Sequence, residues 1–388
     1  MNLSPIHRVA LVALVLSLGT TSCKEDDPAG TPDAPSADAD LTDAPTDGPP
    51  ADGDPACVAG ENDYTPRVNN SADDPFPACV SDADPGTYVT INASVSTIAR
   101  IAAFEDIATM LFIAGAPSQQ AFVDARVTYL QANGLESRVS RREDEHYPPA
   151  MNSGGMVAAC NTLTMAEQQA YPDRCIGPLT LTPFIATAFT DGANATDPLA
   201  RRLAAARIEA GLLHFLQLSV YKEAVTCKAT PADCDSSWAY YGGGDQRSAG
   251  KGLARYTRGL ETLTHDRAFD GVLAVRCWRD LDDPMVTTDD AMFDGLRTIA
   301  LAQLDRAVHR ATALIVRARL VAMSSASGDD LTVHWEMIRY LGRALQRETT
   351  ARDAARGATL AAELAKTDAT QVDEAAIIGV LDAVFPCP

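Results

Sequence analysis

The sequence predicts an all-α protein, a multi-helix bundle of roughly eight to ten helices stapled by disulfides. Three observations indicate this class. Apolar residues recur every three or four positions over long stretches. Alanine is abundant, whereas aromatic residues make up 6% of the 388 residues. No run of alternating apolar and polar residues exceeds a few positions. The helical domain is expected over residues 91–388, which is long enough to bury a sizeable core.

The first two helices are expected between residues 98 and 134. One helical face is formed by Ile98, Ile101, Phe104, Ile107 and Leu111. Gly115 and Pro117 end this helix, and Ser118 can cap the next one. The second helix is expected to turn Phe122, Val123, Val127 and Leu130 inward, with Gly134 after its end.

The later helices are marked by caps and by apolar stripes. Asp197 and Pro198 are a strong start signal, an N-cap followed by proline at the first helical position. The stripe that follows is Leu199, Leu203, Ala206, Leu213, Leu216 and Val220. Residues 289–323 form the longest periodic stretch. Further helices are expected from residue 331 to about 366 and over 372–384, and short extended pieces over 87–91 and 179–181.

Residues 1–22 have the features of a removed signal peptide. Residues 9–18 are an apolar run of ten residues, too short to cross a bilayer core of about 30 Å as a helix. Small residues precede Cys23, as in the bacterial lipobox, where the cysteine is acylated and becomes the mature N-terminus. We expect Cys23 to carry a lipid anchor. Ordinary cleavage after Ser22, which would release a soluble protein, is the alternative.

The segment after Cys23 is predicted to be a disordered tether. Residues 23–56 are rich in Asp, Pro and Ala and contain no aromatic residue, so they bury too little surface to offset chain entropy. Residues 57–90 are a cysteine-containing, turn-rich lead-in. Residues 24–86 hold sixteen acidic and two basic side chains, within a net charge of −20 for the chain. This charge repels phosphate, which argues against a nucleic-acid partner.

The other cysteines are expected to form disulfides. Eight remain without Cys23, an even number that an exported chain can oxidise in pairs. They allow 105 pairings, of which neighbour pairing is the economical one: Cys57–Cys79, Cys160–Cys175, Cys227–Cys234 and Cys277–Cys387. A zinc site is the alternative for clustered cysteines, but the sequence has no CxxC spacing.

Familiar catalytic signatures are absent from the sequence. The glycine-rich segment 242–252 has Gly252 after Lys251, where a P-loop requires serine or threonine. There is no GxSxG elbow, no HExxH and no GxGxxG. We therefore expect a protein that is not an enzyme and has no nucleotide partner.

Five residues are candidate metal ligands. Asp305 and His309 are four apart in a predicted helix and share one face. His214 lies in the helix that the Asp-Pro pair begins, which also carries Glu209 and Glu223. Carboxylates and imidazoles suit iron and other divalent cations. The cofactor is otherwise unknown from the sequence.

Each candidate has a plainer interpretation. Asp305 and His309 can be a surface pair, and His214 a satisfied, half-buried histidine. Glu143 and His146 have the ExxH spacing of di-iron bundles, but they sit in a charged run before two prolines, which predicts a solvated loop. Ligands that converge from different helices would distinguish these interpretations.

Three short segments that contain tryptophan carry a resemblance to known proteins. Residues 237–243 read SWAYYGG, residues 276–278 read RCW, and residues 334–337 read HWEM. This pattern resembles the repeat of algal-type iron-assimilating periplasmic proteins and related helical bacterial lipoproteins. The architecture is also similar to imelysin-like periplasmic proteins, which are duplicated helical bundles linked to iron uptake. The resemblance implies a degenerate two-repeat arrangement and an iron-related role.

The sequence therefore predicts a lipid-anchored, exported binding protein of the cell envelope, facing the periplasm or the cell surface. Its expected partners are the membrane, through the lipid, and uptake machinery. Its expected cargo is iron or another cation. A structural or interaction lipoprotein with no small ligand is the alternative, and a metal-dependent hydrolase of imelysin type is a third, more distant one.

Overall fold

The chain is helical wherever apolar residues recur at helical spacing. The computed structural model describes residue 60 and residues 62–66, 76, 86–113, 115–281 and 290–387. These residues all belong to one compact unit, which spans residues 40–388. Within them there is no strand, and a single isolated bridge joins Met151 to Val157. The all-α class is confirmed.

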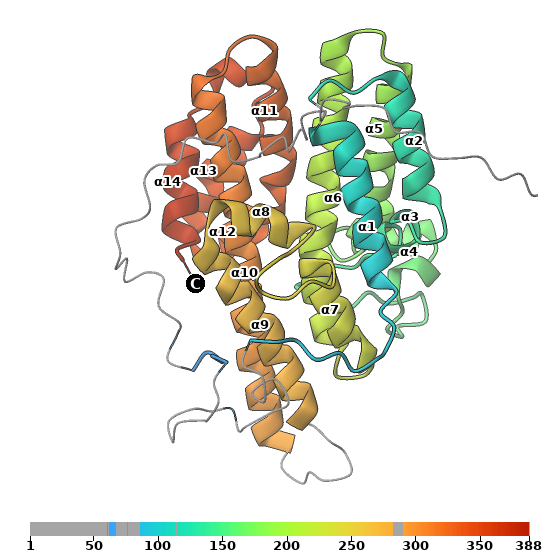
Figure 1. Cartoon of the computed structure of the whole chain (residues 1–388), viewed down its shortest axis with the longest axis vertical. Coiled ribbons are helices and arrows are strands. Elements are labelled where there is room, and N and C mark those ends of the chain that lie inside the picture. The colour runs from blue at the N-terminus through green and yellow to red at the C-terminus, as the bar shows by residue number, and fades with distance from the viewer. Residues whose placement is uncertain are drawn as a thin grey trace, which may run out of the picture. The chain divides into compact units, whose positions relative to one another are not determined.

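The described ranges contain fourteen α-helices (Figure 1). The first seven are α1 (Thr97–Ala108), α2 (Gln119–Leu130), α3 (Glu136–Val139), α4 (Met165–Gln169), α5 (Thr182–Asn194), α6 (Pro198–Thr226) and α7 (Ala232–Gly242). The other seven are α8 (Leu253–Leu260), α9 (Thr262–Leu281), α10 (Asp290–Ser325), α11 (Asp329–Leu341), α12 (Arg343–Arg352), α13 (Ala354–Leu364) and α14 (Glu374–Val384).

The long helix α6 forms the centre of the bundle. It contacts α5 and α7 on one side and α10 and α11 on the other (Figure 1). Asp197 caps α6 as predicted, because its side chain accepts hydrogen bonds from the amides of Leu199 and Ala200. Gly211 lets α5 approach closely, since a Cβ there would lie 2.8 Å from Ile185. The bundle therefore packs around α6, an apolar helix that α10 contacts.

The helix count exceeds the predicted range because one predicted segment divides. Residues 331–366 form α11, α12 and α13 rather than one or two helices. Asp353 separates α12 from α13: its backbone is extended, and its side chain caps α13 through the amides of Ala355 and Arg356. The short helices α3 and α4 add two more elements.

Two local predictions are wrong. Residues 179–181 lie in the helical turn Gly177–Leu181 and are not extended. On α2, Val123, Val127 and Leu130 are 45%, 63% and 55% exposed, so they face outward. Phe122, Ala125 and Tyr129 are the buried residues of this helix. Phe122, Ala125 and Tyr129 lie on one face of the helix. Apolar character alone did not show that this face, and not the one with the two valines, is buried.

Two of the predicted neighbour disulfides are confirmed. Cys160 bonds to Cys175 within the segment between α3 and α5, and Cys227 bonds to Cys234 across the turn from α6 to α7. Cys277 and Cys387 are also disulfide-bonded. The disulfides between described residues do not include one that joins these two cysteines, so the predicted Cys277–Cys387 pair is wrong. Cys57 and Cys79 themselves lie outside the described residues.

Two glutamines bind the backbone of the lead-in to the bundle. The side-chain amide of Gln303 accepts from Tyr64 N at 3.0 Å and donates to Tyr64 O at 2.8 Å. Gln246 makes the same pair of bonds with Tyr88, at 2.8 and 3.1 Å. Phe76 is fully buried beside Tyr64, with ring centroids 5.3 Å apart. The described parts of residues 57–90 therefore contribute to the core.

Candidate metal centre

The centre begins with two residues that lie one turn apart on α10. Asp305 and His309 are spaced i, i+4 and therefore share a face. This face packs inward, and only 3% of the His309 side chain is exposed. His309 Nδ1 lies 2.9 Å from the backbone oxygen of Asp305 and 3.0 Å from its Oδ1. The pair is therefore not the surface pair that the sequence left open, because His309 is buried and only 18% of the Asp305 side chain is exposed.

A third residue, His146, reaches this pair from the segment 142–146. The sequence predicts a solvated loop there. The segment is irregular, but it packs into the bundle, and the side chains of Asp144 and His146 are each only 10% exposed. The prediction of a solvated loop is therefore wrong for these two side chains.

Ion pairs to two parts of the bundle hold the segment 142–146 in place. Arg142 donates to Glu223 of α6 at 3.0 Å. Glu143 and Glu145 both accept from the guanidinium of Arg174, each at 2.8 Å. Residues 144–147 form a turn, in which Tyr147 N donates to Asp144 O at 3.2 Å and His146 N to Asp144 Oδ1 at 3.0 Å. Glu143 and Glu145 bind Arg174, whereas His146 reaches Asp305 of α10.

The Cys160–Cys175 disulfide supports the same segment. Cys160 N donates to Glu143 Oε1 at 2.8 Å. The residue before Cys175 is Arg174, whose backbone oxygen accepts from Asp144 N at 3.0 Å. The disulfide links the two segments that make these hydrogen bonds, one at Cys160 and one at Arg174. It therefore helps to fix the backbone that carries His146.

The three imidazole and carboxylate groups converge at one point. His146 Nε2 lies 3.0 Å from Asp305 Oδ1, and His146 Nδ1 lies 2.6 Å from Asp144 Oδ1. The His146 ring stacks on Tyr221 at a centroid distance of 4.2 Å and meets the His309 ring edge-on at 5.5 Å. One ligand atom each from His146, Asp305 and His309 lies within 4.8 Å of the others.

The electrostatics of the centre favour charge at His146. Burial disfavours the imidazolium, but the hydrogen bonds and charges of Asp144 and Asp305 outweigh it and raise the pKa of His146 to about 9. The pKa values of Asp144 and Asp305 are lowered, because the neighbouring histidines outweigh the effect of burial. Burial lowers the pKa of His214 to about 4.

These residues fit a divalent transition metal. Two imidazoles and one carboxylate are the donor set of non-haem iron sites and of many zinc sites. A metal-bound histidine commonly donates its second N–H to a carboxylate, which sets the tautomer and the ring orientation. Asp144 occupies this position behind His146. A cation held by His146 and Asp305 would take the place of the hydrogen bond between these two side chains.

The structure brings together some of the five predicted ligands and separates others. Asp305 and His309 are in the centre, whereas His214, on α6, is not one of the three clustered ligands. Glu209 pairs with Arg319 at 2.8 Å and Glu223 with Arg142 at 3.0 Å, so both are committed to arginines. The prediction of Glu209 and Glu223 as ligands is therefore not supported by their contacts. Cys23 lies outside the described residues.

The sequence contained a signal for His146 that its spacing from Glu143 obscured. The two prolines after Tyr147 disfavour helix in the preceding residues. An aspartate side chain can accept from the backbone N–H two residues further along the chain, as Asp144 does from His146 N at 3.0 Å. Asp144 and His146 have that separation and act together.

Comparisons with known proteins find no counterpart. No protein-family model matches the chain, and no curated protein or solved structure matches it. The resemblance to iron-assimilating and imelysin-like proteins accordingly stays an expectation.

One described helix, α6, is long and apolar enough to span a membrane. Its most apolar window is 83% buried inside the bundle, as the core helix of a globular domain would be.

Proposed function

We propose that the protein binds a divalent transition-metal cation, iron or zinc by donor set, and that it does so in the cell envelope as a lipid-anchored protein. One observation carries the cation: the ligand atoms of His146, Asp305 and His309 converge within 4.8 Å. Asp144 behind His146 adds the outer contact that such sites use. We propose binding and delivery to uptake machinery rather than catalysis.

A metal titration tests the cation. The whole mature protein is freed of metal on a chelating resin and titrated with Zn²⁺ and, without oxygen, with Fe²⁺. We expect one ion per chain and a rise in the melting temperature, because a ligand that binds only the folded state stabilises it. Failure of both ions to bind or to raise the melting temperature would contradict the proposal.

The affinity for the metal should rise with pH. The metal needs the neutral imidazole of His146, whose pKa is about 9, so the proton competes with the metal at lower pH. Between pH 6 and 8 we expect the apparent affinity to rise about tenfold per pH unit.

The stability of the metal-free protein should show the opposite trend. Unfolded histidine has a pKa near 6.5, so the raised value stabilises the folded state below pH 6.5 and this contribution is lost as pH rises through 9. Calorimetric titration and thermal melts across this range check both trends. A metal affinity that does not change from pH 6 to 8 would exclude His146 as a ligand.

The envelope location has its own test. Expression of the full chain in a bacterium supplied with labelled palmitate should label the protein, and the variant Cys23→Ser should carry no label. The labelled product should partition with membranes. A wild-type product that retains residues 1–22 and carries no lipid would contradict the proposed location, whatever the result of the metal titration.

An interaction protein without a small ligand is the second candidate. The observation in its favour is the outward apolar stripe of Val123, Val127 and Leu130 on α2, which is 45–63% exposed. If the metal titration fails, this stripe becomes the leading functional feature of the described residues.

A further inference from the structure

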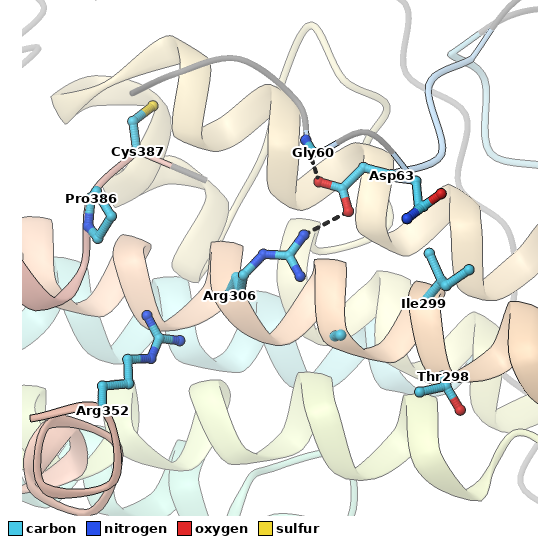
Figure 2. A pocket seen from close by; sticks show the side chains of 10 residues that line it. Gly60, Asp63, Thr298, Ile299, Arg306, Arg352, Pro386 and Cys387 are labelled. Carbon is cyan, nitrogen blue, oxygen red and sulfur yellow. Dashed lines mark hydrogen bonds and ion pairs between the residues drawn. The ribbon is translucent and has the colours of Figure 1, made fainter. Parts of the chain in front are cut away.

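A cavity of about 600 Å³ lies beside α10, on the side where the lead-in and the C-terminus meet (Figure 2). It is lined by Gly60, Asn62, Asp63, Thr298, Ile299, Ala302, Arg306, Arg352, Pro386 and Cys387. Its size is within the range of small-molecule sites in proteins. None of these residues belongs to the metal centre.

Two arginines and one carboxylate supply the charge of the cavity. Arg306 donates from Nη2 to Asp63 at 2.6 Å, and Asp63 also accepts from Gly60 N at 2.9 Å. Arg352 donates from Nε to Glu348 and from Nη1 to the backbone of Val384. Within the described part of the chain, Nε and Nη1 of Arg306 and Nη2 of Arg352 are left for a ligand. The lining side chains sum to one positive charge, and each arginine is paired with a carboxylate, Arg306 with Asp63 and Arg352 with Glu348.

The two guanidinium groups occupy different parts of the wall, as Figure 2 shows. Ile299, Ala302 and Pro386 add apolar wall to the cavity. A ligand that satisfies this arrangement needs at least two anionic groups joined by a carbon skeleton. Arginine binds carboxylates through short charge-assisted hydrogen bonds. A single phosphate ion would fill only part of such a volume.

The cavity is connected to the metal centre through Phe385. The ring of Phe385 stacks on His309 with centroids 6.1 Å apart and parallel planes. The guanidinium carbon of Arg352 lies 5.1 Å from the centroid of the same ring. Pro386 and Cys387, which follow in the chain, form part of the cavity wall. A ligand that contacts Arg352 and this wall therefore acts on the group that packs against a metal ligand.

We propose that this cavity binds a small organic polycarboxylate, and that the polycarboxylate is the chelator that accompanies the cation. The anion site stands on the cavity and its arginines alone, whereas its link to the cation rests on the proposed function. Carboxylates at Arg306 and Arg352 would offset the positive charge that the metal brings to the same side of α10.

The first experiment measures binding of citrate to the metal-free protein by calorimetry, with inorganic phosphate as the second probe. The metal is removed on a chelating resin, so that no soluble chelator competes. We expect one citrate per chain, bound more tightly than phosphate, and an affinity that falls about tenfold in Arg306→Gln. The variant Arg126→Gln, an exposed arginine of α2, should bind citrate like the wild type. No citrate binding, or tighter binding of phosphate, would overturn the polycarboxylate site.

The variant Asp63→Asn shows whether Arg306 acts on citrate through its charge or through its structural role. This variant breaks the same ion pair as Arg306→Gln but leaves the guanidinium in place and removes a competing carboxylate. Citrate affinity should rise in Asp63→Asn. If it falls as in Arg306→Gln, the effect of both variants is structural and the assignment of Arg306 as an anion ligand is wrong.

The link to the cation is tested with Zn²⁺ and with the zinc–citrate complex. Arg306→Gln should bind Zn²⁺ alone as the wild type does but bind zinc–citrate about tenfold more weakly. Equal loss for both forms, or for neither, would overturn the link. If no metal binds at all while citrate still binds the metal-free protein, the proposed function fails and the anion site remains.

Discussion

Replacing His146 by alanine is expected to lower the affinity for Zn²⁺ or Fe²⁺ at least about a hundredfold. His146 supplies the ligand that comes from outside α10, and its Nε2 lies 3.0 Å from Asp305. Without it, Asp305 and His309 offer two ligands from one helix turn, fewer than the three protein ligands of a zinc site with an open position. Metal titration of the variant by calorimetry measures the loss.

Two variants make this result specific. Asp144→Asn keeps the shape of the side chain behind His146 but removes its charge, and loss of such an outer contact typically costs ten- to a hundredfold in affinity. His334→Ala, on α11, removes an imidazole outside the three-ligand cluster and should leave metal affinity unchanged. If His146→Ala and His334→Ala bind metal equally well, the centre described above is not the metal site.

Removing the Cys160–Cys175 disulfide with the double change Cys160→Ser and Cys175→Ser is expected to destabilise the protein by about 2–4 kcal/mol. The bond closes a loop with a sequence separation of 15. Because Glu143 accepts from Cys160 N and Arg174 precedes Cys175, the loosened loop should also weaken metal binding about tenfold. Thermal melts and metal titration measure the two effects.

The second disulfide supplies the matched control. Cys227→Ser with Cys234→Ser opens the turn between α6 and α7, and it should lower stability without changing metal affinity. Hydrogen exchange should show increased opening of residues 142–176 only in the Cys160 and Cys175 variant. Equal loss of metal affinity in both double variants would mean that the first disulfide has no particular role in holding His146.

The sequence predicted those helices whose position is set by a capping residue or by the spacing of apolar residues. The N-cap Asp197 followed by Pro198 begins α6 as expected, and the periodic stretch 289–323 corresponds to α10. The face of α2 was predicted wrongly because Val123 and Val127 are as apolar as the residues that the core selects. Which apolar face of a helix is buried depends on the helices that pack against it. The sequence of a single helix does not show which helices these are.

The metal centre was predictable only where its ligands share an element. Asp305 and His309 follow from the i, i+4 spacing. His146 lies 159 positions from Asp305, and nothing local indicates that the two meet. Glu209 was proposed because it shares a helix with His214, but Arg319, 110 positions away, pairs with it. Long-range partners decide which carboxylates stay available for a cation.

The side-chain amides of Gln303 and Gln246, which hydrogen-bond to the backbone of Tyr64 and Tyr88, also limit how far the chain can be shortened from its N-terminus. A truncated product starting at residue 91 would lose Tyr64 and Phe76 from the interior and would leave the Gln303 amide on α10 without its backbone partner. Laboratory versions of the domain should therefore begin upstream of Gly60, well before the first helix.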